Sequence, residues 1–335
     1  MITSPQIDIA TVADIPGLAA LRIQQEWWER GERLLRPLLA WDGAHMFTIR
    51  AGALDVPLGE QTTPETPIAV VGAIAAGATG VIGNVVVRED YQRRGLARRL
   101  MRAALDWQRE KGVRTSWLDA TVDGRSLYRG VGFADCEPSY YAQTSVDAIH
   151  RGWLERTAGT VRARLAQPEE IARAATLDET AFGGDRIPLL AGVLRQPETW
   201  LYLVEDANGG VLGYLMARTL ESPLAGIRAG SWVATGDAVA AALLVALLAE
   251  DAPWRDVVAH GSHAAHGANT NEPPKVVLSP PGNNPAALTL LRNAHVDIIV
   301  DDLIMRHDFA DASGVIHPAR QRMDWLYGWL AAMVF

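Results

Sequence analysis

The sequence is poor in residues that would crosslink the chain or anchor it in a membrane. Cys136 is its only cysteine, so no internal disulfide bond can form, and we expect a reducing, cytoplasmic location. No apolar run approaches the roughly 18 residues of a transmembrane helix, and we expect no membrane partner. The N-terminal residues lack the basic start and the apolar stretch of a signal peptide.

Positive charge is also scarce. Lys and Arg number 31 against 39 Asp and Glu, which gives a net charge of −8. Because nucleic-acid binding needs a basic face, we expect no nucleic-acid partner. Arginine is nevertheless dense over 88–102. This local reversal of sign indicates either a solvated helix face or a site for an anionic ligand.

The remaining composition is that of a globular protein. Hydrophobic residues make up 49% and charged residues 21% of the 335 residues, which favours a soluble protein with a sizeable core and two domains. In the first half we predict strands at 7–10, 45–51, 68–76 and 81–88. Helices are predicted from Asp14, a candidate cap, towards Gly31 and over 32–41.

A change of period at Leu96 predicts a long amphipathic helix. The apolar residues 96, 97, 100, 101, 104 and 105 share one face, and the arginines face the other way. Gly112 ends this helix. A strand over 113–120, a short helix over 124–130 and a strand over 133–143 complete a mixed α/β pattern.

The second half repeats this order of elements. After a connector at 144–159, strands are predicted at 161–165, 200–205, 211–218, 230–234, 276–278 and 296–305. Helices are predicted at 168–181, 237–249 and 286–293. The pattern indicates a diverged internal repeat of about 150 residues. We predict domains at 1–145 and 160–312, a linker at 146–159 and a helical tail at 313–335.

The tail has an apolar pattern of its own. Trp325, Leu326, Trp329, Leu330 and Phe335 recur at helix-like spacing. So much exposed apolar surface is a liability, so we expect the tail to pack at a domain interface or in a homodimer. Few basic residues accompany it, which disfavours a membrane-surface role.

One segment carries the arrangement of a phosphate site. An apolar strand ends at Val87 and leads through Gln92-Arg-Arg-Gly-Leu-Ala97 into the long helix. The first amides of a helix have no internal acceptor, and the helix dipole adds positive charge there. Gly95 lets the backbone approach a ligand, and the arginines suit an anionic diphosphate.

With a second motif, this segment resembles the GCN5-related N-acetyltransferase (GNAT) superfamily. Val85–Ala97 is similar to its acyl-CoA motif, and Leu127-Tyr-Arg-Gly-Val-Gly-Phe133 to its following helix and turn. The resemblance covers about 6–145. It implies an α/β fold with two GNAT-like domains, each a mixed α+β sheet flanked by helices and splayed after the motif strand, with acyl-CoA in the cleft.

The resemblance also implies roles for particular residues. The backbone of Val85, Val86 and Val87 would pair with the pantetheine arm. Thr121 stands where many relatives have an Asn that bonds this arm, and Tyr128 matches the tyrosine often assigned as general acid. The diphosphate would be held by the amides of Gln92, Arg93, Arg94, Gly95, Leu96, Ala97 and Arg98.

The general base is open in the sequence. Some relatives carry a carboxylate on the motif strand, whereas 79–87 has only Asn84 as a polar candidate. Glu26, His45 and Asp119 are candidates on neighbouring elements, and each also fits a surface, capping or structural role.

The second half lacks the features of a cofactor site. Its corresponding strand-to-helix turn, 232–240, has no Gln or Arg, and Asp237 would oppose a diphosphate at the helix start. Leu291 stands in place of Tyr128. We therefore expect one acyl-CoA per chain, and a second domain that builds a substrate cleft or a dimer.

Two other groups of reactive residues give weaker evidence for a functional site. His260, His263 and His266 have a spacing that suggests a metal site, but the glycine-rich, polar surroundings favour a loop. Neither a Cys nor a nearby carboxylate pair completes a ligand set, so we expect no metal. A covalent route through Cys136 would need a His partner that the sequence does not place.

The sequence therefore predicts an N-acetyltransferase. An amine of a small molecule or peptide would attack acetyl-CoA directly in a ternary complex. One alternative is a non-catalytic acyl-CoA-binding sensor or scaffold. A second is a thiol-biosynthetic tandem GNAT, which would be expected to keep its cofactor turn in the second half.

Overall fold

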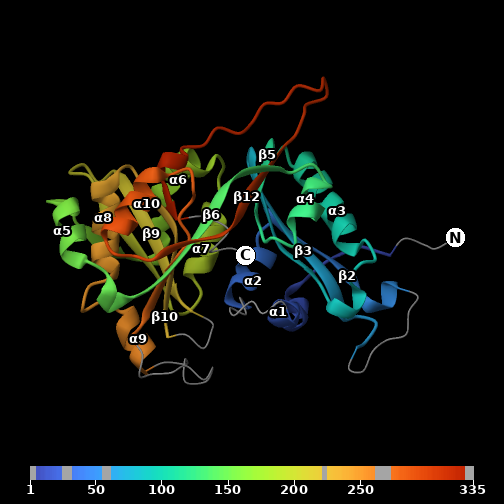
Figure 1. Cartoon of the computed structure of the whole chain (residues 1–335), viewed down its shortest axis with the longest axis horizontal. Helices are drawn as coiled ribbons and strands as arrows, with labels where there is room; N and C mark the ends of the chain where they lie inside the picture. The colour runs from blue at the N-terminus through green and yellow to red at the C-terminus, as the bar shows by residue number, and fades with distance from the viewer. Residues whose placement is uncertain (1–4, 25–31, 55–61, 221–224, 261–272, 329–335) are drawn as a thin grey trace. The chain divides into compact units, whose positions relative to one another are not determined.

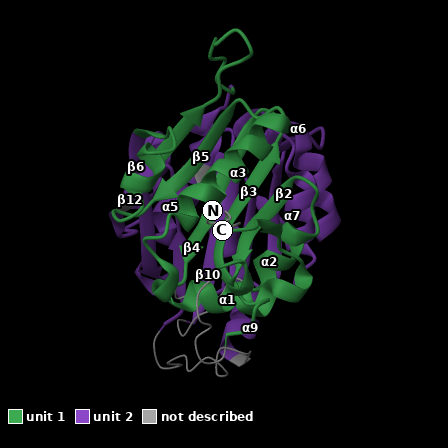
Figure 2. Cartoon of the chain, turned by 90° about the vertical axis from the view of Figure 1, so that its right-hand side faces the viewer, with its two compact units in different colours: residues 1–135, 305–319, 335 green, residues 136–304, 320–334 purple. Residues whose placement is uncertain are grey.

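The structure, a computed structural model, describes residues 5–24, 32–54, 62–220, 225–260 and 273–328. The chain forms two compact units, coloured separately in Figure 2. Unit 1 contains the residues up to Asp135 together with Met305–Ala319, and unit 2 contains Cys136–Ile304 and Arg320–Val334. Each unit has a mixed sheet with helices, which confirms the predicted α/β class and its two-domain organisation.

The sheet of unit 1 keeps the order of the sequence. Its first four strands pair antiparallel and its last pair is parallel. Thr48 lies opposite Val70, and Ala73 opposite Ile82. The strands are β1 (Asp8–Ile9), β2 (Ala44–Arg50), β3 (Pro67–Ala76), β4 (Thr79–Val87) and β5 (Thr115–Ala120), and the end of β12 (Ile298–Asp308) follows β5.

Four α-helices accompany this sheet within the described residues: α1 (Ile15–Gln24), α2 (Glu32–Leu39), α3 (Leu96–Glu110) and α4 (Arg125–Arg129). They are labelled in Figure 1. Ahead of α1, the Asp14 carboxylate accepts from the Thr11 amide at 2.7 Å, so Asp14 caps from inside the first turn rather than from the position before it.

The amphipathic face of α3 is the predicted one. Leu100, Met101 and Ala104 are fully buried against the sheet. Gln108, also fully buried, donates through Nε2 to the carbonyls of Ile74 at 2.7 Å and Val81 at 3.2 Å. This side-chain amide therefore fixes the C-terminal end of α3 to β3 and β4.

A segment from late in the chain completes unit 1. Asp308 accepts from the Thr115 hydroxyl at 2.8 Å, and the Phe309 amide donates to the Arg114 carbonyl at 2.9 Å. His307 Nδ1 lies 2.9 Å from the Gly132 carbonyl and its ring lies 5.5 Å from that of Phe133. The turn after α4 is therefore braced by residues distant in the sequence.

Unit 2 repeats the same strand order. Strands β7 to β10 pair antiparallel in sequence, and β10 pairs with β11 in parallel. The order matches that of β1 to β5, as the predicted repeat requires. The strands are β6 (Ala134–Ser145), β7 (Ala163–Ala166), β8 (Thr199–Glu205), β9 (Val211–Thr219), β10 (Gly226–Ala234) and β11 (Lys275–Leu278).

Two helices of unit 2 are not predicted by the sequence pattern. They are α7 (Ile187–Leu194) and α9 (Trp254–His260). Ile187–Leu194 is apolar almost throughout, which gives no helical period to detect. The other α-helices described in this unit are α5 (Arg151–Ala158), α6 (Ala175–Phe182), α8 (Asp237–Leu247) and α10 (Pro285–Asn293), and the 3₁₀ segment η5 (Pro168–Ala174) precedes α6.

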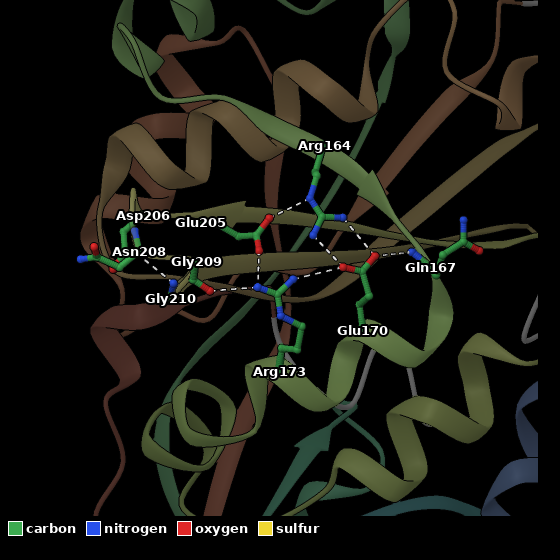
Figure 3. A network of polar contacts seen from close by, with 9 residues as sticks. All are labelled: Arg164, Gln167, Glu170, Arg173, Glu205, Asp206, Asn208, Gly209 and Gly210. Atoms are coloured by element: carbon green, nitrogen blue, oxygen red, sulfur yellow. Dashed lines mark hydrogen bonds and ion pairs between the residues drawn. The ribbon is translucent and has the colours of Figure 1, made fainter.

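An exposed ion-pair network ties η5 to β7 and β8 (Figure 3). Arg164 contacts Glu170 at 2.6 Å and Glu205 at 2.7 Å, and Arg173 pairs with both carboxylates. Hydrogen bonds from Arg164 and from the Gln167 amide lower the pKa of Glu170 to about 2. Because the network is exposed, it fixes local geometry more than it stabilises the fold.

A buried ion pair lies in the core of unit 2. Arg186 and Asp178 are fully buried and 2.8 Å apart, and the Tyr214 hydroxyl donates to the same carboxylate. We expect Asp178→Asn to lower the free energy of unfolding by about 3 kcal/mol, because it leaves a buried guanidinium without its counter-charge. Urea unfolding measures this, with Glu155→Gln in the exposed Arg151–Glu155 pair as control. Equal effects of the two changes would contradict the prediction.

The predicted helical tail is wrong over the residues that the structure describes. Met323–Trp325 forms a 3₁₀ turn, η7, and Leu326–Gly328 forms a strand, β13, that pairs with β10. The helix-like spacing of apolar residues is overridden here by an open strand edge. Trp329, Leu330 and Phe335 lie outside the described residues.

Candidate active site

The sheet of unit 1 opens beside β4. β4 and β5 pair in parallel only where Thr79–Val81 meets Thr115–Trp117. β4 continues to Val87, and no strand in the described part of the chain pairs with this edge of β4 beyond Val81. The main-chain groups of this edge are therefore available to a ligand that lies in extended form.

A bulge marks the place where the strands part. Val70 lies opposite Val86 and Gly72 opposite Gly83, so β4 carries one extra residue there. Asn84 adopts the left-handed conformation with φ 49°. Such a conformation is uncommon for non-glycine residues but is tolerated best by Asn and Asp. Asn84 therefore suits the position sterically, whereas β-branched neighbours such as Val85 would not.

A buried arginine holds the bulge. Arg22 on α1 donates to Oδ1 of Asn84, and both side chains are buried. Nδ2 of Asn84 is also buried and has no hydrogen-bond partner among the described residues. Arg22 is not recognisable in the sequence as a partner of Asn84, because 62 positions separate the two residues. One amide donor of Asn84 is thus left unsatisfied among the described residues.

The three valines after the bulge alternate as a half-buried strand requires. Val86 is 1% exposed and packs in the core, whereas Val85 and Val87 are partly exposed on the other face. Their backbone lies along the open edge of β4. This is the geometry that the resemblance assigns to the pantetheine-binding strand.

The turn between β4 and α3 is built from left-handed residues. Arg93 has φ 61° and Gly95 φ 76°. A Cβ added at Gly95 would meet no heavy atom within 4 Å, so the glycine is needed for the backbone conformation and the space beside it is open. A turn that contains left-handed residues can point successive backbone amides to one side, which makes an anion-binding concavity.

The backbone amides of this turn divide into two groups. The Gln92 amide donates to the Glu89 carbonyl at 3.2 Å, and the Gln92 side chain donates to the Val87 carbonyl at 3.1 Å. Gln92 thus fixes the turn from within. Across the described residues, the amides of Arg93–Arg98 have no acceptor, and the first bonded one is that of Arg99, to Gly95 at 3.1 Å.

Positive charge surrounds these amides. Arg93, Arg94 and Arg98 are exposed, while Leu96 is buried and Ala97 partly buried. Arg94 lies 5.4 Å from the Tyr91 ring and donates to the Asp90 carbonyl at 3.3 Å. Arg88 pairs with Asp90 at 2.7 Å, and its guanidinium lies 4.6 Å from the centre of the Tyr91 ring. The exposed guanidiniums suit a diphosphate.

Tyr128 is packed into the interior from α4. Its side chain is 7% exposed, and its ring meets that of Phe133 edge-on at 6.3 Å. The Tyr128 carbonyl accepts from the amides of Val131 and Phe133 at 3.1 and 3.0 Å. The short helix therefore fixes the ring through the turn that follows it.

The structure brings the two sequence motifs together at one contact. A Cβ added at Gly130, the residue after α4, would lie 3.0 Å from Nη2 of Arg98 in the first turn of α3. The two helices are neighbours in Figure 1 as well. Thr121 follows the end of β5, is exposed, and accepts from the Gly124 amide at 3.0 Å. Thr121 and Tyr128 thus flank one short loop.

Gly124, which is not among the site residues predicted from the sequence, makes room for Tyr128. A Cβ added at Gly124 would lie 2.6 Å from Cε2 of Tyr128. We expect Gly124→Ala to displace the ring, to lower the free energy of unfolding by about 1–2 kcal/mol and to lower kcat about tenfold. Thermal unfolding and steady-state kinetics measure both effects. Gly152→Ala, where only one side-chain atom comes near at 3.7 Å, is the control.

The three candidate bases differ in their surroundings. His45 on β2 stacks on Trp107 with ring centroids 4.5 Å apart. Burial and then the charge of Lys111 lower the pKa of His45, which keeps it neutral near pH 7. Asp119 is partly buried on β5, and Glu26 lies outside the described residues. The stacked ring fits a structural role for His45 better than that of a base.

No group of three or more His, Cys, Asp or Glu that could hold a metal occurs among the residues that the structure describes. His263 and His266 lie outside that part of the chain. Within it there is also no helix long and apolar enough to cross a membrane. Cys136 is exposed and unbonded to another cysteine.

A splayed mixed sheet beside a basic helix start is the arrangement that the GNAT resemblance implies. Residues 19–133 match the family model "Acetyltransferase (GNAT) family", and residues 174–265 match the model "Acetyltransferase (GNAT) domain". The chain belongs to the GCN5-related N-acetyltransferase superfamily and carries two of its domains in tandem. The family resemblance read from Val85–Ala97 and Leu127–Phe133 is confirmed.

Relatives match over most of the chain. It is 25% identical over 274 residues to the uncharacterized N-acetyltransferase YitH of Bacillus subtilis (strain 168), covering 79% of this chain and 88% of YitH. A solved structure of a proposed acetyltransferase from Pyrococcus horikoshii has a TM-score of 0.67 at 20% identity, covering 99% and 96% of the two chains. A tandem GNAT protein from the clavulanic acid biosynthesis pathway has a TM-score of 0.57 at 12% identity, covering 91% and 98%. At these identities the two structures show the shared fold alone.

Proposed function

We propose that the chain transfers an acetyl group from acetyl-CoA to an amine of a small molecule or peptide, by direct attack in a ternary complex. One observation carries the proposal: the open edge of β4 leads straight into a basic turn whose amides, from Arg93 to Arg98, have no acceptor among the described residues. In acyl-CoA the extended pantetheine arm leads to the diphosphate. The chain offers a strand edge and then an anion-binding concavity, which is the same order.

The cofactor would lie along both features. Its pantetheine arm would pair with the backbone of Val85–Val87. Its diphosphate would accept hydrogen bonds from the backbone amides of Arg93–Arg98. The Gln92 amide is already used within the turn, so this residue would support the diphosphate site without donating to it. Thr121 would offer its hydroxyl to the arm from the end of β5.

The chemistry needs a neutral amine. An alkylamine with a pKa of about 10 must lose a proton at pH 7, which costs about 4 kcal/mol. Its nitrogen then attacks the thioester carbonyl carbon, the C–S bond breaks and the thiolate leaves. A backbone amide of β4 near Val87 would polarise the carbonyl oxygen. Nδ2 of Asn84, buried and without a partner among the described residues, is a second candidate donor.

Tyr128 would act on the leaving sulfur. Proton transfer from a tyrosine of pKa about 10 to a thiolate of pKa about 8.5 is uphill by roughly 2 kcal/mol. A hydrogen bond from the phenol to the sulfur therefore accounts for most of its effect unless the bound state lowers the pKa of Tyr128. In either case the phenol stabilises charge that develops only as the C–S bond breaks.

The test is a CoA-release assay against a panel of amines, amino acids and peptides. We expect release with at least one acceptor. Acyl-CoA binding, measured by calorimetry, without release across the panel would support the sensor or scaffold alternative instead. The net charge of −8 favours cationic acceptors, so polyamines and basic peptides belong in the first panel.

A further inference from the structure

Unit 2 contains its own splayed pair of strands. β10 and β11 pair in parallel only where Gly226–Arg228 meets Lys275–Val277. A bulge follows on β10: Gly230 lies opposite Met216 and Trp232 opposite Leu215, with Ser231 as the extra residue at φ 46°. Ser231 thus repeats the left-handed position of Asn84. The second unit keeps the groove geometry although its turn has lost the basic residues.

A strand from the same chain lies in this groove. β13 pairs antiparallel with β10, with Gly328 opposite Trp232 and Leu326 opposite Val233. β9 already occupies the other edge of β10 at these positions. β13 must therefore lie on the edge that faces β11, past the point where β10 and β11 separate. In unit 1 the corresponding edge, beyond Val81 on β4, is open among the described residues.

One buried side chain is arranged to hold this strand. Asn284 is fully buried and precedes α10, whose Ala287 amide donates to its Oδ1 at 3.0 Å. Its Nδ2 donates to the carbonyls of Asp324 at 3.1 Å and Leu326 at 2.9 Å. Asn284 lies in the connection between β11 and α10, and Thr121 lies in the connection between β5 and α4, where the family resemblance puts the Asn that bonds the pantetheine arm. Here that amide bonds a peptide instead.

Further contacts anchor the segment. Leu326 is 1% exposed, and the Arg322 amide donates to the carbonyls of Thr180 and Ala181 at 3.3 and 3.2 Å. Gln321 donates through Nε2 to the Phe182 carbonyl at 2.6 Å. The segment is therefore fixed at the end of α6 as well as along β10.

The helix start beyond the groove is unsuited to a diphosphate. Gly236 has φ 173°, an extended conformation, in contrast to the left-handed Gly95. Asp237 places a carboxylate in the first turn of α8. An anionic ligand would meet a like charge where unit 1 offers arginines.

We propose that residues 322–328 fill the cofactor-arm groove of unit 2 as a built-in peptide ligand, so that this groove takes an extended main chain and not acyl-CoA. That this groove corresponds to a cofactor site rests on the function proposed for unit 1. That β13 occupies the groove does not depend on that function. The chain then binds one acyl-CoA, and the second unit depends on its C-terminal segment to satisfy the edge of β10.

Hydrogen exchange measured by mass spectrometry tests the role of Asn284. Asn284→Asp keeps the acceptor that caps α10 and removes both donors to the segment. We expect amides of Trp232–Ala234 that face β13 to exchange at least tenfold faster in this variant. Asn293→Asp, the same change at the exposed opposite end of α10, is the control and leaves this exchange unaltered. Unchanged exchange in Asn284→Asp overturns the proposal.

A second variant and a second measurement keep the test decisive. If Asn284→Asp does not fold, a chain ending at Ala319 removes β13 while keeping the whole return segment of unit 1, and the same faster exchange is expected. Calorimetry with acetyl-CoA on the native chain should give one equivalent. Two equivalents overturn the occupied groove, whereas none overturns the function proposed for unit 1 and leaves the exchange result standing.

Discussion

Tyr128→Phe is expected to lower kcat by about 100-fold while the dissociation constant of acetyl-CoA changes less than twofold. The change removes only the hydroxyl, and the ring keeps its edge-on contact with Phe133. An interaction made with the leaving sulfur strengthens as the C–S bond breaks, so its loss appears in kcat. Groups that transfer or share a proton in a transition state commonly contribute factors of roughly 100 to 10,000.

The control separates this role from packing. Tyr140→Phe alters a partly buried tyrosine on β6 and is expected to leave kcat unchanged. Thermal unfolding of Tyr128→Phe should show a folded variant at the assay temperature, because the ring still fills its site. If kcat of Tyr128→Phe stays within twofold of the unaltered chain, Tyr128 only packs the cleft.

Gly95→Asp is expected to raise KM for acetyl-CoA by about 100-fold. An aspartate tolerates the left-handed backbone of Gly95 better than most residues, and the open space beside it accepts the side chain. Its carboxylate would face the diphosphate at the helix start. Repulsion between these charges of about 2.7 kcal/mol corresponds to the expected factor. Unit 2 carries such a charge naturally at Asp237.

Two further variants separate the effect of the added charge on KM from the effect of backbone strain. Gly95→Asn has the same shape and no charge, so it should raise KM by about tenfold at most. Gly112→Asp introduces the same residue at φ 84° at the other end of α3, where a Cβ also meets nothing within 4 Å, and should leave KM unchanged. Equal KM values for Gly95→Asp and Gly95→Asn would contradict an electrostatic diphosphate site. High salt should reduce the difference in KM between Gly95→Asp and Gly95→Asn, because it screens the charge repulsion.

The proposed cofactor site was largely predictable because its parts are consecutive in the chain. The strand, the Gln92–Ala97 turn and the helix stripe are read from period and residue type, and the structure gives α3 and β4 the expected places. The role of Tyr128 and the contacts of Val85–Val87 with an acyl-CoA stay predictions, as do the domain limits at 145 and 160. The turn differs from the expectation at Gln92, whose backbone amide donates to the Glu89 carbonyl within the turn.

Residues that act across the chain were not predictable in this way. Arg22 reaches Asn84 over 62 positions, and His307 reaches the Gly132 carbonyl over 175. Neither leaves a periodic signal, because the contact depends on where the sheet places each element. The tail shows the same limit more sharply: its apolar spacing suggested a helix, and an unpaired edge of β10 made it a strand.

The sequence by itself therefore determined the family, the repeat and the single basic turn, since these depend on neighbouring residues and their charges. Only the tertiary structure decided what occupies the second groove. A strand edge left open by the parting of β10 and β11 needs hydrogen-bond partners, and the polar groups of residues 322–328, held by Asn284, supply them. That pairing depends on three segments meeting in space, which no local pattern encodes.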